Sequence, residues 1–120
     1  MPKQFQYIAH VTKVYDGDTI TCDIDCGLSI VLKQQKIRLY GINAPEVKGI
    51  EKIEKGGLKA RDALADKILN KTIILHTIKD KKGKYGRYLG IVYLDDVNIN
   101  QWLVDNGYAE IYLDSENLLH

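Results

Sequence analysis

The chain has 120 residues, of which 45% are hydrophobic and 28% are charged, and its formal net charge is +1. This length and composition predict one domain, residues 1–120, with a single core, and exclude a collagen-like, low-complexity or disordered chain. No segment is apolar enough for a membrane helix or for the core of a secretory signal. We therefore expect a cytoplasmic protein that does not bind membranes and would be secreted only if the sequence has been trimmed.

The first part of the chain has the composition of β structure. Apolar and polar residues alternate over much of residues 7–42, between turn signals at Asp16-Gly17 and Cys26-Gly27, which predicts two or three strands in a meander. An extended segment would hold Cys22 and Cys26 about 13 Å apart, beyond the reach of a disulfide. Both thiols are therefore expected to be reduced and partly buried.

The remaining part of the chain mixes helical and strand patterns. Apolar residues recur at helical spacing from 58 to 69, which predicts an amphipathic helix of about a dozen residues behind Gly56-Gly57. Strands are expected at 72–78 and 88–94 around a basic loop, followed by a turn at Asp95-Asp96. A second helix is expected from about 98 to 106, with Gly107 as its stop, and then an extended segment at 108–112. This α+β, mainly β order favours a small closed or partly open barrel.

Two acids flank the glycine of the first turn. If Asp18 already has strand geometry, its carboxylate points the same way as that of Asp16, and two like charges so placed need a cation or hydrogen-bond donors nearby. The alternative is an Asp-Gly turn with solvated acids.

Arg38 interrupts an otherwise apolar strand, so it either extends to the strand edge or projects into a cleft where an anion neutralises it. The corner after this strand is stiffened by Pro45. It offers oxygen ligands for a hard cation from Asn43, Glu46 and the Ala44 carbonyl. The alternative is a surface arginine paired with Glu46, with Asn43 shaping a turn.

The basic loop at 79–88 interleaves lysines and Arg87 with Tyr85 and Tyr88. Cations such as Lys84 bind phosphates, and exposed tyrosine rings stack on bases. Tyr112 extends such a stacking surface, although core or edge packing is the other interpretation of this residue. The alternative for the whole loop is a solvated basic hairpin.

Taken together, these residues form the set expected for phosphodiester hydrolysis. A divalent ion would lower the pKa of water and neutralise a phosphate oxygen. Glu46 would orient or deprotonate the attacking water, and Arg38 and Arg87 would bind the charge that develops on phosphorus.

Three motifs in order then match a known family: VYDGDT at 14–19, IRL at 37–39 followed by APE at 44–46, and KYGR at 84–87. Over about residues 13–112 the chain resembles the staphylococcal nuclease-like, or thermonuclease, domain. The resemblance implies an OB-fold, a five-stranded barrel with two packed helices. It also implies a Ca²⁺-dependent endonuclease that cleaves DNA and RNA with little sequence preference and leaves 3′-phosphates, and we expect single strands to be preferred.

The resemblance implies a role for the residues of these motifs. The catalytic set would be Arg38, Arg87 and Glu46, with Glu46 as the general base. The metal set would be Asp18, Asn43, the carbonyl of Ala44 and the nearby Asp16. The substrate would be held by Lys84 and Tyr85, to which the stacking candidates Tyr88 and Tyr112 are added.

Two departures from the family pattern affect these expectations. Asn43 stands where the best-known members have a calcium-binding Asp, so the site has one negative charge fewer and should bind Ca²⁺ more weakly or select another ion. This feature favours the alternative function, a weakly active or inactive OB-fold module that binds nucleic acid. The segment 19–38 is also longer than in compact members, which predicts an extended hairpin around Cys26.

The small net charge conceals a strongly polarised chain. Residues 1–47 carry five cations and five acids, residues 48–90 carry twelve cations and five acids, and residues 91–120 carry six acids and no Lys or Arg. A basic middle of this kind is consistent with local capture of a nucleic acid. We expect the protein to act as a monomer.

Overall fold

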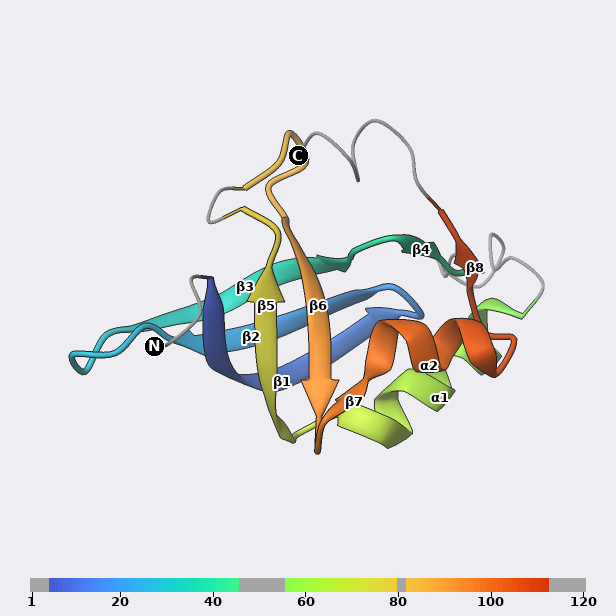
Figure 1. Ribbon diagram of the computed structural model, residues 1–120, viewed down its shortest axis with the longest axis horizontal. Helices are drawn as coiled ribbons and strands as arrows, with labels where there is room; N and C mark the ends of the chain where they lie inside the picture. Colours follow the sequence, from blue (N-terminus) through green and yellow to red (C-terminus); the bar gives the residue numbers. More distant parts are fainter. Residues whose placement is uncertain (1–4, 46–55, 80–81, 113–120) are drawn as a thin grey trace.

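The computed structural model describes residues 5–45, 56–79 and 82–112. Its first three strands, β1 (Gln6–Asp16), β2 (Thr19–Asp25) and β3 (Val31–Leu39), form an antiparallel meander (Figure 1). Alternate residues of β2, namely Ile20, Cys22 and Ile24, are buried, because successive side chains of a strand point to opposite faces. The strands expected in this part of the sequence are confirmed.

Two later strands close this meander into a barrel. β5 (Thr72–Thr77) pairs antiparallel with β1 and with β6 (Tyr88–Leu94), and β6 pairs in parallel with the end of β3. At the closure, a Cβ on Gly90 would lie 2.7 Å from Cδ1 of Leu75, so glycine leaves room there for the Leu75 side chain. The five strands form the closed barrel of an OB-fold, as expected.

Two helices pack against this barrel, both toward the same end (Figure 1). α1 (Gly57–Ile68) has 12 residues and buries Ala60, Leu64 and Ile68, which recur every fourth residue and so share one face. α2 (Ile99–Asp105) begins at the N-cap Asn98, whose side chain accepts the N–H of Gln101 at 3.0 Å. Both predicted helices are confirmed. Neither has the length and apolar character needed to span a bilayer.

Three strands of two residues complete the described part of the chain. β4 (Ile42–Asn43) follows β3 and pairs antiparallel with β8 (Glu110–Ile111), which confirms the extended segment expected after α2. β7 (Val97–Asn98) pairs with the end of β6 and was not expected. The turn between β6 and β7 is at Asp95 and Asp96, and both have positive φ angles, 51° and 66°, as a tight hairpin turn requires.

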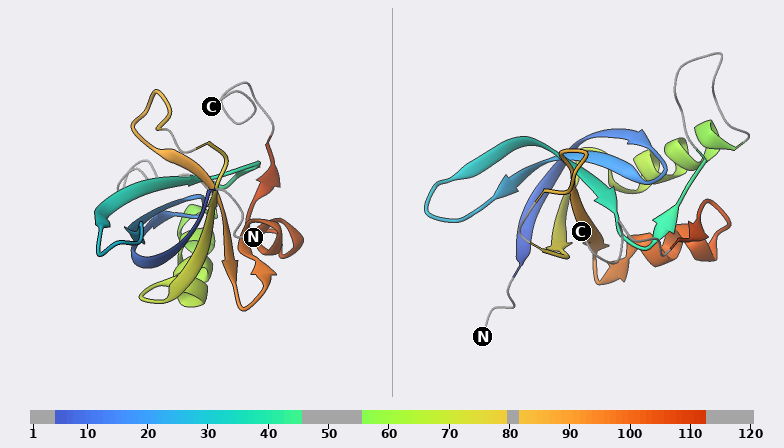
Figure 2. Two further views of the ribbon diagram at one scale, coloured as in Figure 1. Left: turned by 60° about the vertical axis from the view of Figure 1, so that its left-hand side comes forward. Right: turned by 90° about the horizontal axis from the view of Figure 1, so that it is seen from above.

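The hairpin between β2 and β3 projects beyond the barrel, away from the helices (Figure 2). Its turn is closed by the N–H of Cys26, which donates to the carbonyl of Ile30 at 2.9 Å. The prediction of an extended hairpin is therefore confirmed. Cys22 and Cys26 are both free thiols, but they differ in environment: Cys22 is buried in the core, which raises its pKa to about 12, whereas Cys26 is exposed.

Candidate active site

The turn between β1 and β2 brings two carboxylates into the interior. Asp16 and Asp18 are both buried, and the backbone N–H of Asp18 donates to Oδ1 of Asp16 at 3.1 Å. A Cβ on Gly17 would lie 2.8 Å from the Cβ atoms of Ala44 and Ala60. Glycine therefore lets this turn contact both the chain after β4 and helix α1, and the alternative of solvated acids is wrong.

Asp18 is held by three neighbours. Its Oδ1 accepts a hydrogen bond from the Thr19 hydroxyl at 3.1 Å, and its Oδ2 accepts one from the backbone N–H of Ala44 at 2.8 Å. The same Oδ2 lies 3.5 Å from Nη2 of Arg38. A buried carboxylate needs such partners because burial without them is costly.

Arg38 supplies the positive charge at the centre of this cluster. Its side chain is only 10% exposed, and its Nη1 donates to the backbone carbonyl of Leu39 at 2.8 Å. Its Nη2 also donates to Oδ1 of Asn43 at 3.3 Å. The sequence left two interpretations open for Arg38: a position at the strand edge, or one in a cleft where an anion neutralises it. The structure shows neither of these, because Arg38 is buried and Asp18 neutralises it inside the fold. Its suggested partner Glu46 lies outside the described residues.

Asp16 is the member of the cluster that faces an open cleft. Burial raises its pKa from 3.8 to about 7, and the hydrogen bond and negative charge of Asp18 contribute in the same direction. This carboxyl group therefore changes its protonation close to neutral pH. A cation bound nearby would favour its ionised form.

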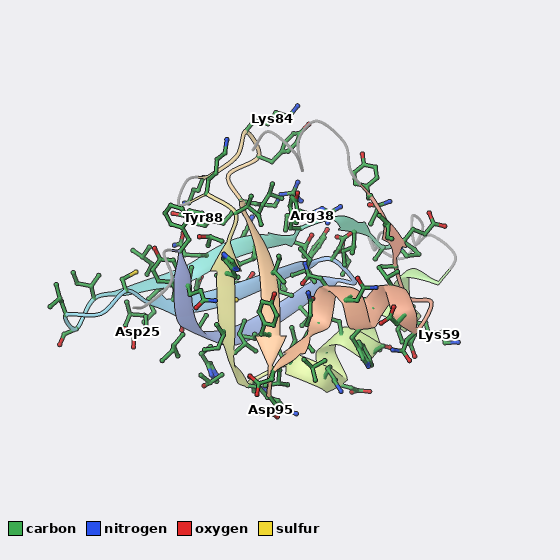
Figure 3. All side chains as sticks on the ribbon, in the orientation of Figure 1. Asp25, Arg38, Lys59, Lys84, Tyr88 and Asp95 are labelled. Carbon is green, nitrogen blue, oxygen red and sulfur yellow. The ribbon has the colours of Figure 1, made fainter. Side chains whose placement is uncertain are left out.

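The cleft beside Asp16 has a volume of about 490 Å³ and is bordered by β1, β2, β3 and the chain before β6. Tyr85 and Arg87 line it, and the Tyr85 side chain is 61% exposed. Two cations lie near its ring centre, Arg87 at 5.4 Å and Lys84 at 5.1 Å. Figure 3 shows Lys84 and Arg38 toward the same side of the barrel. The fold therefore brings Tyr85 and Arg87 of the basic loop to the cleft beside the Asp16–Asp18 turn, with Lys84 next to Tyr85.

Other predicted site residues do not line this cleft, although Asn43 and Ala44 are hydrogen-bonded to the Arg38–Asp18 cluster. Tyr88 lines a separate hollow of about 240 Å³ together with Tyr7 and Cys26. Asn43 and Ala44 line a third hollow, of about 260 Å³, next to the end of α2. Tyr112 follows β8, and its backbone N–H donates to the carbonyl of Gly41 at 2.8 Å. The tyrosines therefore do not form one continuous surface around the main cleft.

Comparison with known proteins identifies the family. The family model described as "Staphylococcal nuclease homologue" matches residues 36–118. The chain belongs to the staphylococcal nuclease family.

Individual relatives agree with this assignment. The thermonuclease of Staphylococcus hyicus is 35% identical over 100 residues, which cover 82% of this chain and 56% of the relative. An uncharacterized endonuclease of Haemophilus influenzae is 36% identical over 102 residues, covering 85% and 51%. An uncharacterized protein of Methanocaldococcus jannaschii is 29% identical over 135 residues, covering 93% and 62%. This member of the staphylococcal nuclease family thus spans little more than half the length of the curated relatives that it matches.

The oxygens around the Arg38 guanidinium are chemically suited to a hard cation in this staphylococcal nuclease-family chain. They are the carboxylate of Asp18 and the amide oxygen of Asn43, with the second carboxylate, of Asp16, next to Asp18. Ca²⁺ prefers such ligands. The pKa of Asp16 is raised mainly by burial and further by Asp18, so a cation bound nearby would offset the cost of ionising this carboxyl group. Within residues 5–45, 56–79 and 82–112, no three His, Cys, Asp or Glu side chains gather into a metal-binding group. The oxygen donors are therefore of the type that Ca²⁺ binds, but among the described residues only Asp16 and Asp18 supply carboxylates to this cluster.

Sequence reasoning missed several residues that border the site. Thr19 orients Asp18, and the outward-facing Lys13, Tyr15 and Lys36 line the cleft. The signal for these residues was the alternation of β1 and β3, which places every second side chain on the outer face of the barrel. This alternation identifies the residues on the outer face of the barrel, but it does not show which of them lie next to the Asp16–Asp18 turn.

Proposed function

We propose that this chain is a Ca²⁺-dependent endonuclease that hydrolyses phosphodiester bonds of DNA and RNA, with a preference for single strands, little sequence preference and 3′-phosphate products. The observation that carries the proposal is the buried Asp18–Arg38 ion pair, 3.5 Å between charged atoms, next to Asp16, which lines a cleft together with Arg87 and Tyr85. Membership of the staphylococcal nuclease family supports it.

The residues of the cleft have chemistry suited to this reaction. The Arg87 guanidinium can hold two phosphate oxygens at once and stabilise the charge that develops on phosphorus. Tyr85, which is mostly exposed, offers a ring on which a base can stack. Arg38 contacts both Asp18 and Asn43 through Nη2, and so positions their oxygens.

Asp18, Asn43 and the Ala44 carbonyl would hold the metal, with Asp16 beside them. Bound Ca²⁺ would supply a Lewis acid that lowers the pKa of water and neutralises a phosphate oxygen. In our proposal Glu46, which lies outside the described residues, takes the proton of the attacking water. Lys84, beside Tyr85, contributes positive charge for the phosphate.

The direct test is cleavage of a labelled single-stranded 12-mer with Ca²⁺ and with a chelator. We expect cleavage only with Ca²⁺, and a loss of at least about a hundredfold in Glu46→Gln and in Arg87→Ala, which remove a general base and a phosphate ligand. Lys33→Gln is a matched control, since Lys33 is exposed and pairs with Asp23 on the projecting hairpin. Full cleavage by Glu46→Gln or Arg87→Ala would contradict the proposal.

The second candidate function is an OB-fold module that binds nucleic acid without cleaving it. Asn43 favours it, because an amide oxygen attracts Ca²⁺ less than a carboxylate does. Titration calorimetry separates the two functions: no heat of Ca²⁺ binding and no turnover, with salt-sensitive oligonucleotide binding retained, would select the binding module. If the chain is the proposed nuclease, Asn43→Asp should tighten Ca²⁺ binding several-fold.

A further inference from the structure

A row of polar side chains crosses the outer face of the barrel beside the candidate active site. In the strand register, Lys13 of β1 lies opposite Thr21 of β2, and Thr21 lies opposite Lys36 of β3. The next residues along these strands include Ile20 and Ile37, which are fully buried, so the row faces outward. Because neighbouring strands are about 4.8 Å apart, the row spans roughly 10 Å.

All three residues of the row line the 490 Å³ cleft together with Arg87, and the charges there are strongly unbalanced. Asp16 is the sole acid among the described residues that line it. Within the described part of the chain, neither Lys13 nor Lys36 forms an ion pair, whereas Lys33, on the same strand as Lys36, lies 3.6 Å from a carboxylate oxygen of Asp23. The cleft therefore presents positive charge that a polyanion can neutralise.

An aromatic ring lies on each of two sides of this cleft. Tyr15, from β1, is 48% exposed, and Tyr85, from the chain before β6, is 61% exposed. Each has a cation near its ring centre: Lys13 at 5.9 Å from that of Tyr15, and Arg87 at 5.4 Å from that of Tyr85. Alternating rings and cations are the combination that proteins use to bind the bases and phosphates of single strands.

We propose that Lys13, Tyr15 and Lys36 form a strand-binding track, in which Tyr15 stacks on a base and the two lysines hold phosphates of a single-stranded nucleic acid beyond the bond that is cleaved. This inference rests on the proposed function for the chemistry at Arg87. The track lies where OB-folds present their ligand face, across β2 and β3 between the β1–β2 turn and the chain before β6. It makes the chain favour substrates long enough to reach Lys36.

The binding test compares two double variants that lose the same charge. Fluorescence anisotropy with a labelled single-stranded 12-mer, in chelator and over a range of salt concentrations, measures the slope of log K against log salt. Lys13→Gln/Lys36→Gln should reduce this slope by about 1.4, since each phosphate contact on a single strand contributes about 0.7. Lys33→Gln/Lys59→Gln is the control, since Lys59 is on α1, away from the Lys84 loop (Figure 3), and it should leave the slope unchanged.

The aromatic part of the track is tested separately. Tyr15→Ala should weaken binding of the 12-mer by roughly tenfold, the size of one base-stacking contact. Tyr15→Phe keeps the ring and should restore binding to within about twofold. Equal weakening by both substitutions would overturn the stacking role, because it would point to the hydroxyl group or to the local fold.

A cleavage assay separates this inference from the proposed function. With Ca²⁺, the ratio of kcat/KM for the 12-mer to that for a dinucleotide should fall about tenfold in Lys13→Gln/Lys36→Gln. If the unaltered chain cleaves but neither the ratio nor the salt slope changes in this variant, the track is wrong and the nuclease assignment stands. If the slope changes as expected and no chain cleaves either substrate, the track stands and the nuclease assignment fails.

Discussion

Arg38 and Lys84 show two ways in which this fold places a positive charge. Arg38 is buried and bonded to the interior through Asp18, Asn43 and the Leu39 carbonyl. Lys84 is exposed, and its Nζ lies 5.1 Å from the ring centre of Tyr85. A buried charge depends on every partner, whereas an exposed one is screened by water. Stability should therefore depend on the buried cluster, while ligand binding should depend mainly on the exposed loop.

Removing the buried cation should have the largest effect. Arg38→Ala leaves the Asp18 carboxylate buried without its charge partner, so we expect the free energy of unfolding to fall by about 3–5 kcal/mol and cleavage to be lost. Urea unfolding with a chelator measures the first effect. Arg61→Ala is the matched control, because Arg61 pairs with Asp62 on the surface of α1 and should cost less than about 1 kcal/mol. Equal losses in the two variants would remove the distinction between buried and exposed charge.

Filling the space at the acidic turn should have the next largest effect. In Gly17→Ala the new Cβ would lie 2.8 Å from the Cβ atoms of Ala44 and Ala60, so the turn must shift. We expect a loss of about 1–3 kcal/mol of stability and a clear loss of cleavage. Gly27→Ala, at a φ of +78° with nothing within 4 Å, tests backbone strain alone. It should lose stability but keep its activity, and a Gly17→Ala variant that also kept full activity would contradict the close contact.

The acid beside the cleft should make stability depend on pH. The pKa of Asp16 is about 7 in the fold against an ordinary 3.8, so between these values the folded chain holds more protons than the unfolded chain. Its contribution to the free energy of unfolding is therefore fully present below about pH 4, decreases as the pH rises toward 7, and is lost above that. The slope is at most about 1.4 kcal/mol per pH unit, the limit for one proton.

Asp16→Asn keeps an oxygen acceptor for the N–H of Asp18 but removes the titration, so it should flatten this pH dependence in urea unfolding from pH 4 to 8. Asp66→Asn, on the exposed surface of α1, changes the net charge equally and should keep the slope of the unaltered chain. An unchanged slope in Asp16→Asn would show that another group is responsible.

The exposed loop should give the smallest effect on stability. Tyr85→Ala removes a ring that is 61% exposed, so the free energy of unfolding should change by less than about 0.5 kcal/mol. Affinity for a single-stranded 12-mer should nevertheless fall about tenfold, because one base loses its stacking partner. Anisotropy and urea unfolding on the same preparation test both parts. A large loss of stability would mean that this loop, like Arg38, is part of the core.

Local patterns were sufficient to predict most of the elements. α1 followed from apolar residues that recur every fourth position, such as Leu64 and Ile68, and the meander followed from alternation between turn signals. β7 was missed because its two residues carry no pattern of their own, and it exists because the turn at Asp95 and Asp96 brings it back onto β6.

The candidate site was only partly predictable. The two acids, the basic loop and the corner after β3 were identified from residue types. The position of the Arg38 side chain could not be predicted in this way, because it depends on Asp18, twenty residues earlier in the chain, and on Asn43 after the strand. Likewise, nothing in the sequence indicated that Tyr88 lines a different hollow from Tyr85.

The sequence by itself determined the longer strands and both helices, the family, and which side chains have the chemistry to bind phosphate or a cation. These properties depend on local spacing and on residue type. Tertiary structure alone decided that Arg38 is neutralised inside the fold and that Lys13, Thr21 and Lys36 form one row. The reason is physical: both arrangements depend on the register in which β1, β2 and β3 pair, and the energies of buried charges depend on the contacts that this register creates.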